Sequence, residues 1–324
     1  MNIRIASLVT HVLPGRGLAP FSRAGAAPWE SVGNTPLLRL PHIGRGLPPS
    51  VRLLAKAEWM NPGGSVKDRA ASRMILEGEK SGRLGPGRTI VDATSGNTGV
   101  AYAMIGAARG YPVKLFVPAN TEPGLLAVLR AYGAEVVLTD PTQGMDGATR
   151  EVQKLVAAHP DTTFFPDQLN NPANWRAHYE GTAAEIWKQS AGRVTHFVAG
   201  VGTGGTLVGT GRRLRELSRD LRIVCVQPDS PLHGLEGIRH LETTIVPGIY
   251  DPGIVDETVA VSTEAAQAMA VRLAREEGIF VGVSAGANVA ASLEVARRIT
   301  KGVVVTILPE GGRRSVMDSF WGHA

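Results

Sequence analysis

A lysine that follows a glycine-rich turn is the first part of this sequence that could do chemistry. Lys67 lies just after the turn-forming residues 63–65, and Ala70, Met74 and Ile75 behind it predict an amphipathic helix that begins near Lys67. The N-terminus of a helix disfavours a protonated amine. Lys67 could therefore present a free amine that forms a Schiff base with a cofactor aldehyde.

The charged residues of this segment also have ordinary explanations. Most lysines are exposed, so Lys67 could be a solvated surface residue. Asp68 and Arg69 follow it and could form a surface ion pair, an interaction that contributes little to stability.

A second segment, residues 94–99 (TSGNTG), joins a predicted strand at 89–93 to a predicted helix at 100–105. Backbone N–H groups and hydroxyls at such a junction can bind an anion. The segment predicts a site for a substrate carboxylate, with Asn97 also reaching a cofactor. A simple helix cap is the alternative.

A third segment, residues 202–206 (GTGGT), follows the apolar segment 196–199 and precedes a predicted helix at 207–217. Glycines and threonine hydroxyls at a helix start suit a phosphate group. A tight turn without a ligand would also need glycine. The spacing matches neither the Walker motif nor the dinucleotide-binding fingerprint.

These segments belong to a longer series of motifs, which in chain order are 34–37 (NTPL), 61–69 (NPGGSVKDR), 94–99, 168–174 (QLNNPAN), 202–206 and 278–286 (GIFVGVSAG). The series runs from about Trp29 to about Pro309. It resembles the cysteine synthase and cystathionine β-synthase family of fold-type II pyridoxal-phosphate enzymes. Segments 237–239 (GIR) and 247–250 (PGIY) make it most similar to the B-type cysteine synthases.

The resemblance implies a role for each matching residue. Lys67 is similar to the Schiff-base lysine, Asn97 to the residue beside the phenolic oxygen of pyridoxal phosphate, and Ser284 to the partner of the pyridine nitrogen. The expected phosphate loop is Gly202, Thr203, Gly204, Gly205 and Thr206. The expected carboxylate site is Thr94, Ser95, Gly96, Thr98 and Gln168, and Arg239 is a candidate for binding a further anionic group of the substrates.

Ser284 has a chemical consequence if it faces the pyridine nitrogen. A neutral hydroxyl cannot hold that nitrogen protonated as a carboxylate can, so the cofactor is a weaker electron sink. This favours β-elimination over a long-lived carbanion. A small residue required at a crowded turn is the alternative explanation for Ser284.

The reaction implied by the resemblance is β-replacement through an aminoacrylate intermediate. Lys67 would act as general base, the donor would be O-acetylserine or O-phosphoserine, and the nucleophile would be sulfide or thiosulfate. The product would be L-cysteine or S-sulfocysteine. Cystathionine β-synthesis from serine and homocysteine, deamination of threonine or serine, and a non-catalytic scaffold that binds a partner are the alternatives.

Two segments depart from the family pattern. Residues 120–126 (NTEPGLL) place Pro123 and Gly124 where cysteine synthases start a helix. Residues 309–321 (PEGGRRSVMDSFW) lack the family's C-terminal signature and are more similar to the cystathionine β-synthases. The second-substrate pocket is therefore the part that the resemblance defines least.

Composition restricts the class of protein. The chain has 324 residues, 43% hydrophobic and 19% charged, and a net charge of +5, which is typical of a globular enzyme. No apolar run is long enough for a membrane helix, and no basic cluster suggests nucleic acid. Cys225 is the single cysteine; it lies in a predicted buried strand, and a reducing, cytoplasmic location is expected. The histidines show no metal-ligand spacing.

Alternating strand-like and helix-like segments predict an α/β fold with parallel sheets covered on both faces. Ligand groups should then gather at the carboxyl ends of the strands. The resemblance implies two doubly wound α/β domains with the active site between them, residues 61–168 forming the small mobile one and residues 29–60 with 169–324 the large one. Residues 1–28 are expected to be a flexible extension, and the enzyme a homodimer that acts on small molecules.

Overall fold

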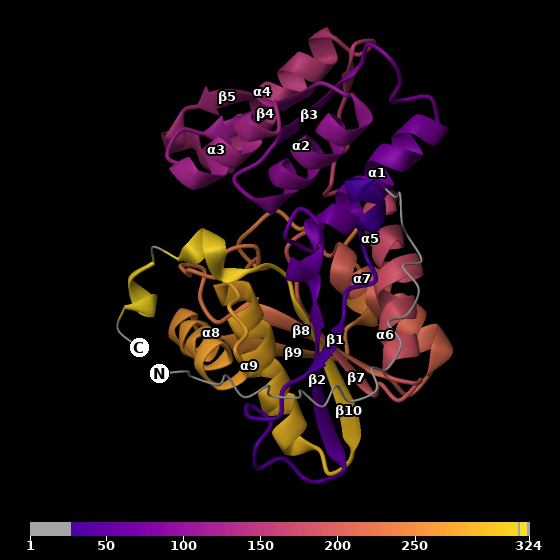
Figure 1. Cartoon of the computed structure of the whole chain (residues 1–324), viewed down its shortest axis with the longest axis vertical. Helices are drawn as coiled ribbons and strands as arrows, with labels where there is room; N and C mark the ends of the chain where they lie inside the picture. The colour runs from indigo at the N-terminus through magenta and orange to yellow at the C-terminus, as the bar shows by residue number, and fades with distance from the viewer. Residues whose placement is uncertain (1–26, 317, 323–324) are drawn as a thin grey trace, which may run out of the picture.

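The computed structural model describes residues 27–316 and 318–322, so most of the expected N-terminal extension lies outside the described part. Figure 1 shows two sheets, and the larger has the strand order β1-β2-β10-β7-β8-β9. Its neighbouring strands run parallel, except that β1 is antiparallel to β2. The bounds are β1 Leu37–Arg39, β2 Val51–Ala57, β7 His196–Gly200, β8 Arg222–Pro228, β9 Glu257–Val261 and β10 Gly302–Leu308.

The smaller sheet is built from the middle of the chain and is parallel throughout, with the order β5-β4-β3-β6. Its strands are β3 Thr89–Ala93, β4 Val113–Pro118, β5 Glu135–Thr139 and β6 Thr163–Phe164. In Figure 1 this sheet lies above the larger one. The chain therefore leaves the larger sheet after β2 and returns to it with β7.

Both faces of the larger sheet are buried. Along β10, Val304 packs into the core beneath α8 and α9, whereas Val305 packs into the core beneath α6 and α7. This alternation is the period of two of a strand, and apolar residues on both faces are typical of a parallel sheet. The helices are α6 Ala183–Gln189, α7 Gly205–Leu217, α8 Thr263–Glu277 and α9 Val283–Arg298.

The smaller sheet is covered in the same way. Ile90 packs with α1, α2 and α3, whereas its neighbour Val91 packs with α4. The bounds are α1 Lys67–Lys80, α2 Asn97–Arg109, α3 Pro123–Ala131 and α4 Gly144–Ala158. The predicted α/β class, with parallel sheets covered on both faces, is therefore confirmed.

Helix starts and short elements complete the fold. Pro123 is the first residue of α3, so the unusual Pro-Gly pair begins a helix there, as proline at the first helical position can. α5 Pro172–Ala177 continues through a π-helical turn, His178–Thr182, into α6. The 3-10 turns are Pro28–Ser31, Glu58–Met60, Pro141–Gln143, Pro252–Ile254, Gly312–Ser315 and Ser319–Trp321. Within the described ranges, no helix combines the length and apolar character that crossing a membrane requires.

Candidate active site

Lys67 is the first residue of α1, as the sequence predicts. The turn before it is closed by Asp68, whose Oδ2 accepts a hydrogen bond from the Gly63 N–H at 2.6 Å. Gly64 has φ +87°, a conformation that favours glycine. Burial raises the pKa of Asp68 to about 7, although the hydrogen bond from Gly63 opposes the shift. Lys67 itself is half-buried and stands on a turn that local hydrogen bonds hold.

Asp68 and Arg69 do not form the surface ion pair that was the ordinary alternative for them. Both side chains are buried, and Arg69 binds two other carboxylates, Glu58 at 2.6 Å and Glu185 at 2.7 Å. Lys56 joins the same cluster through Glu185 at 2.6 Å. The Arg69 and Lys56 hydrogen bonds outweigh the effect of burial and lower the pKa of Glu185 to about 2. The cluster fixes the first turn of α1 against β2 and α6.

The loop 94–98 joins β3 to α2, which begins at Asn97. The buried Thr94 hydroxyl accepts from the N–H groups of Gly96 and Gly99, both at 3.1 Å, so Thr94 closes the loop. Ser95 is exposed and Gly96 half-buried. The first N–H groups of α2 have no acceptor within the helix. The loop therefore combines a cap with donors suited to an anion.

Thr98 connects this loop to the turn before α5. Its hydroxyl donates to Oε1 of Gln168 at 2.9 Å, so two residues of the predicted carboxylate site are in direct contact. The Gln168 carbonyl accepts from Asn174 Nδ2 at 2.7 Å, and the same amide donates to the Thr203 hydroxyl at 3.1 Å. The structure thus brings the loop at 94–98 and the loop at 202–206 together through Gln168 and Asn174.

The loop 202–206 lies between β7 and α7, which begins at Gly205. Gly204 has φ +88°, and a Cβ on Gly205 would lie 2.0 Å from Asn174 Oδ1, so neither position accepts a side chain without strain. The Thr203 hydroxyl accepts from the Gly205 N–H at 3.3 Å. The loop and the first turn of α7 form a cradle of the kind that binds phosphate.

His178 supports this cradle, although the sequence analysis gave it no specific role. It lies in the π-helical turn, 3.0 Å from Thr182 Oγ1 and 3.3 Å from Thr206 Oγ1. Burial, together with the positive charges of Arg69 and Lys67, lowers the pKa of His178 to about 3. The imidazole is therefore neutral at physiological pH. A π-turn is frequent at functional sites, and here it places His178 between Thr182 and Thr206.

Ser284 lies in the first turn of α9 and is 4% exposed. Its Oγ is buried and has no hydrogen-bond partner within the described part of the chain. A buried polar atom without a partner is unfavourable by about 1–3 kcal/mol. A group that can hydrogen-bond a ring nitrogen is therefore present where the resemblance requires one.

Glu310 is a site residue that the sequence analysis missed. It follows β10, is 9% exposed, and its carboxylate accepts a hydrogen bond from Asn97 Nδ2. Its backbone forms a bridge with Ser65, and its carbonyl accepts from the Gly282 N–H at 3.4 Å. Only the unusual C-terminal segment indicated that this region differs from the family.

Arg239 lies beside the cradle. Its Nε donates to the carbonyl oxygen of Gly202 at 2.9 Å. Burial lowers the pKa of Arg239, although the charge of Asp146 opposes the shift. A half-buried guanidinium next to a glycine-rich loop is suited to an anionic group.

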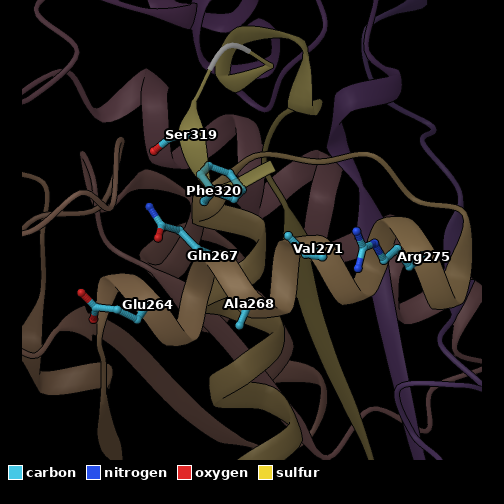
Figure 2. Close-up of a pocket in the computed structure, with 7 residues that line it drawn as sticks. All are labelled: Glu264, Gln267, Ala268, Val271, Arg275, Ser319 and Phe320. Carbon is cyan, nitrogen blue, oxygen red and sulfur yellow. The ribbon is translucent and has the colours of Figure 1, made fainter. Parts of the chain in front are cut away.

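Two other features of the surface and interior bear no relation to these residues. An open groove of about 510 Å³ lies between α8 and residues Ser319 and Phe320, and Figure 2 shows that it contains none of the candidate site residues. Cys225 is buried in β8, and burial raises the pKa of its thiol to about 11. No cluster of three or more possible metal ligands occurs in the ranges that the structure describes.

The geometry is that of an α/β protein with a glycine-rich cradle suited to phosphate, a loop of donors suited to an anion, and a lysine at the start of a helix. A family model described as pyridoxal-phosphate dependent enzyme matches residues 29–310. The chain therefore belongs to the pyridoxal-phosphate dependent enzymes, and pyridoxal phosphate is its cofactor.

Individual relatives agree with this family. The chain is 47% identical to a cysteine synthase of Aquifex aeolicus over 91% of the chain and 92% of that protein. It is 44% identical to cysteine synthase B of Escherichia coli over 91% and 95%. The crystal structure of a cysteine synthase from Entamoeba histolytica superimposes with a TM-score of 0.90 at 34% identity, covering 94% and 93%.

Proposed function

We propose that the protein is a cysteine synthase-type transferase that replaces the β-substituent of an activated serine with a sulfur nucleophile. The relatives named above support this reaction. The observation that carries the proposal is the continuous set of contacts that joins the motif segments. Thr98, Gln168, Asn174 and Thr203 are linked side by side, and Asn97 and the turn before Lys67 both contact Glu310.

The residues present fit pyridoxal phosphate. Gly202 to Thr206 and the first turn of α7 would hold its phosphate, and the buried Ser284 hydroxyl would gain a partner in its pyridine nitrogen. Lys67 would bond to its aldehyde and Asn97 would face its phenolic oxygen. When bound, the cofactor withdraws electrons from the Cα of the amino-acid substrate.

The remaining groups bind the donor and move its proton. The loop at Thr94, Ser95, Gly96 and Thr98, together with Gln168, holds the substrate carboxylate, so that Cα is presented to the Lys67 amine. Lys67 then takes the Cα proton as general base. A neutral His178 leaves the Thr206 hydroxyl free of a neighbouring positive charge, so phosphate binding does not depend on the protonation of that histidine.

Both substrates, the amino-acid donor and the sulfur nucleophile, have two candidates. The donor is O-acetylserine or O-phosphoserine, and the nucleophile is sulfide or thiosulfate. Arg239 supports an anionic partner, because its guanidinium is half-buried and, within the described residues, is anchored on Gly202 through Nε alone. The product is L-cysteine when the nucleophile is sulfide and S-sulfocysteine when it is thiosulfate.

The proposal extends to domains and assembly. Residues 61–168 form the small substrate-binding domain, and residues 29–60 with 169–324 form the large cofactor-binding domain. Support comes from the position of the smaller sheet between β2 and β7. We also propose a cytoplasmic homodimer, which sedimentation of the purified protein and cell fractionation would test.

A product assay with mass detection tests the function. Purified protein is offered O-acetylserine, O-phosphoserine or serine, each with sulfide, thiosulfate or homocysteine. Cysteine or S-sulfocysteine from an activated serine is the expected result, and Lys67→Ala is the matched inactive control. Cystathionine from serine and homocysteine as the main product would replace the proposal, and no product from any pair would contradict it.

A further inference from the structure

Three segments that carry proposed cofactor contacts meet at Glu310. The residue forms a backbone bridge with Ser65, two positions before Lys67. Its carbonyl accepts from Gly282, two positions before Ser284. Its side chain accepts from the Asn97 amide. A single residue at the end of β10 therefore contacts the surroundings of all three groups.

The backbone of this region is fixed on both sides. The Val66 N–H donates to the carbonyl of Pro309 at 2.8 Å, and Gly311 forms a bridge with Val281. A Cβ on Gly282 would lie 3.2 Å from the Glu310 carboxylate, so the carboxylate is packed closely against the N-terminus of α9. Because main-chain contacts hold it, Glu310 offers Asn97 an acceptor in a defined position.

An asparagine amide has two N–H donors. In Asn97 one of them is taken by Glu310, and no other hydrogen bond of the side chain occurs within the described residues. A carboxylate accepts but cannot donate when it is ionised. The Glu310 carboxylate must therefore face the amide nitrogen of Asn97 and not its oxygen. The second N–H of that nitrogen points away from Glu310, and the amide cannot rotate to exchange its nitrogen and oxygen.

We infer that Glu310 is a positioning residue for Asn97, and through Asn97 for the bound cofactor. The inference rests on the proposed function, because it requires Asn97 to face the phenolic oxygen of pyridoxal phosphate. Glu310 fixes the orientation of the amide so that one N–H is always available to that oxygen. It touches neither substrate nor reacting atoms in this role, and acts only by orienting the amide.

The test is a double-mutant cycle on cofactor affinity. Cofactor is removed from wild type, Glu310→Ala, Asn97→Ala and the double variant, and each apoprotein is titrated with pyridoxal phosphate by absorbance. Glu310→Ala should weaken binding roughly 2- to 10-fold, the factor that corresponds to one hydrogen bond. In the Asn97→Ala background the same substitution should have no further effect, because the two residues act as a unit.

Two further variants separate orientation from charge and folding. Glu310→Gln should bind cofactor with an affinity between those of wild type and Glu310→Ala, because its amide oxygen can still accept from Asn97 but its NH2 can also donate to an Asn97 amide that has turned round. Glu277 is a matched control, since its carboxylate also accepts hydrogen bonds, from the backbone N–H groups of His42 and Ile43, but outside the site. Glu277→Ala should leave cofactor affinity unchanged. If Glu310→Ala does not fold, Glu310→Asp, whose carboxylate is one methylene shorter, takes its place with the same expected loss.

The inference is overturned if Glu310→Ala binds cofactor as wild type does, if its effect persists in full without Asn97, or if Glu310→Gln is as weak as Glu310→Ala. An Asn97→Ala variant with unchanged affinity also overturns it. Borohydride reduction and peptide mapping of the same preparations decide the proposed function separately, because they ask only whether the cofactor is attached to Lys67.

Discussion

Replacing Ser284 with alanine should stabilise the cofactor-free protein but weaken cofactor binding. The Oγ of Ser284 is buried without a hydrogen-bond partner within the described residues. Ser284→Ala removes this unfavourable buried polar atom, which should stabilise the cofactor-free protein by about 1 kcal/mol. The same change removes the proposed partner of the pyridine nitrogen and should weaken cofactor binding by about 0.5–1.5 kcal/mol, roughly 2- to 10-fold.

Ser292 supplies a matched control on the same helix. It is also buried, but its hydroxyl donates to the Asn288 carbonyl at 2.6 Å. Ser292→Ala therefore loses a hydrogen bond that exists in the apoprotein and should lower the free energy of unfolding relative to Ser284→Ala by about 2 kcal/mol. Both changes are serine to alanine within α9. Ser292→Ala should leave cofactor affinity unchanged.

The assays are urea denaturation of the apoproteins and absorbance titration with pyridoxal phosphate. Ser284→Asp adds a third measurement, because a carboxylate at this position favours a protonated pyridine nitrogen. This variant should release the β-substituent of the donor more slowly than wild type. If Ser284→Ala destabilises the apoprotein as much as Ser292→Ala and binds cofactor normally, Ser284 does not face the nitrogen and the assignment is refuted.

Three further predictions follow from the same geometry. Lys67→Ala should abolish the covalent attachment of pyridoxal phosphate, shown by borohydride reduction and peptide mapping, and a modified lysine elsewhere would contradict the assignment. Arg239→Ala should raise KM for O-phosphoserine at least about 10-fold more than KM for O-acetylserine, because a half-buried guanidinium contributes more to binding an anion; equal changes in steady-state kinetics would exclude this role. In the folded protein His178 stays neutral, because its pKa is lowered from 6.5 to about 3. The unfolded state therefore binds an extra proton, and the free energy of unfolding falls by about 1.4 kcal/mol per pH unit as pH decreases from about 6.5 towards 3. His178→Gln should make the free energy of unfolding, measured by urea denaturation, less pH-dependent across that window, and an unchanged slope would show that the histidine titrates normally.

Local sequence patterns were sufficient to predict the strands and helices that carry the motifs. The predicted strand at 89–93 is β3, and α1 begins at Lys67. These elements are predictable because turn glycines and apolar periodicity act over a few neighbouring residues. The proximity of the three motif segments followed from the general rule that ligand groups gather at the carboxyl ends of parallel strands.

Contacts between distant segments were not predictable in this way. Arginine is mostly exposed, yet Arg69 is buried by Glu58 and by Glu185, which lies 116 positions further along the chain. Glu310 reaches Asn97 across 213 positions. Whether a charged side chain is buried depends on which elements pack over it, and no pattern within a few residues records that.

The π-helical turn makes this part of the chain intolerant of a change in length. His178 at its start contacts Thr206 on α7, and Glu185 beyond its end contacts Arg69 on α1. A π-turn holds one more residue than an α-helical turn. If the same residues formed a regular α-helix instead, one partner would be rotated by about 100° relative to the other. Inserting one residue at 179–181 should therefore separate either the cradle or the buried ion cluster from its support, because the turn already contains an extra residue.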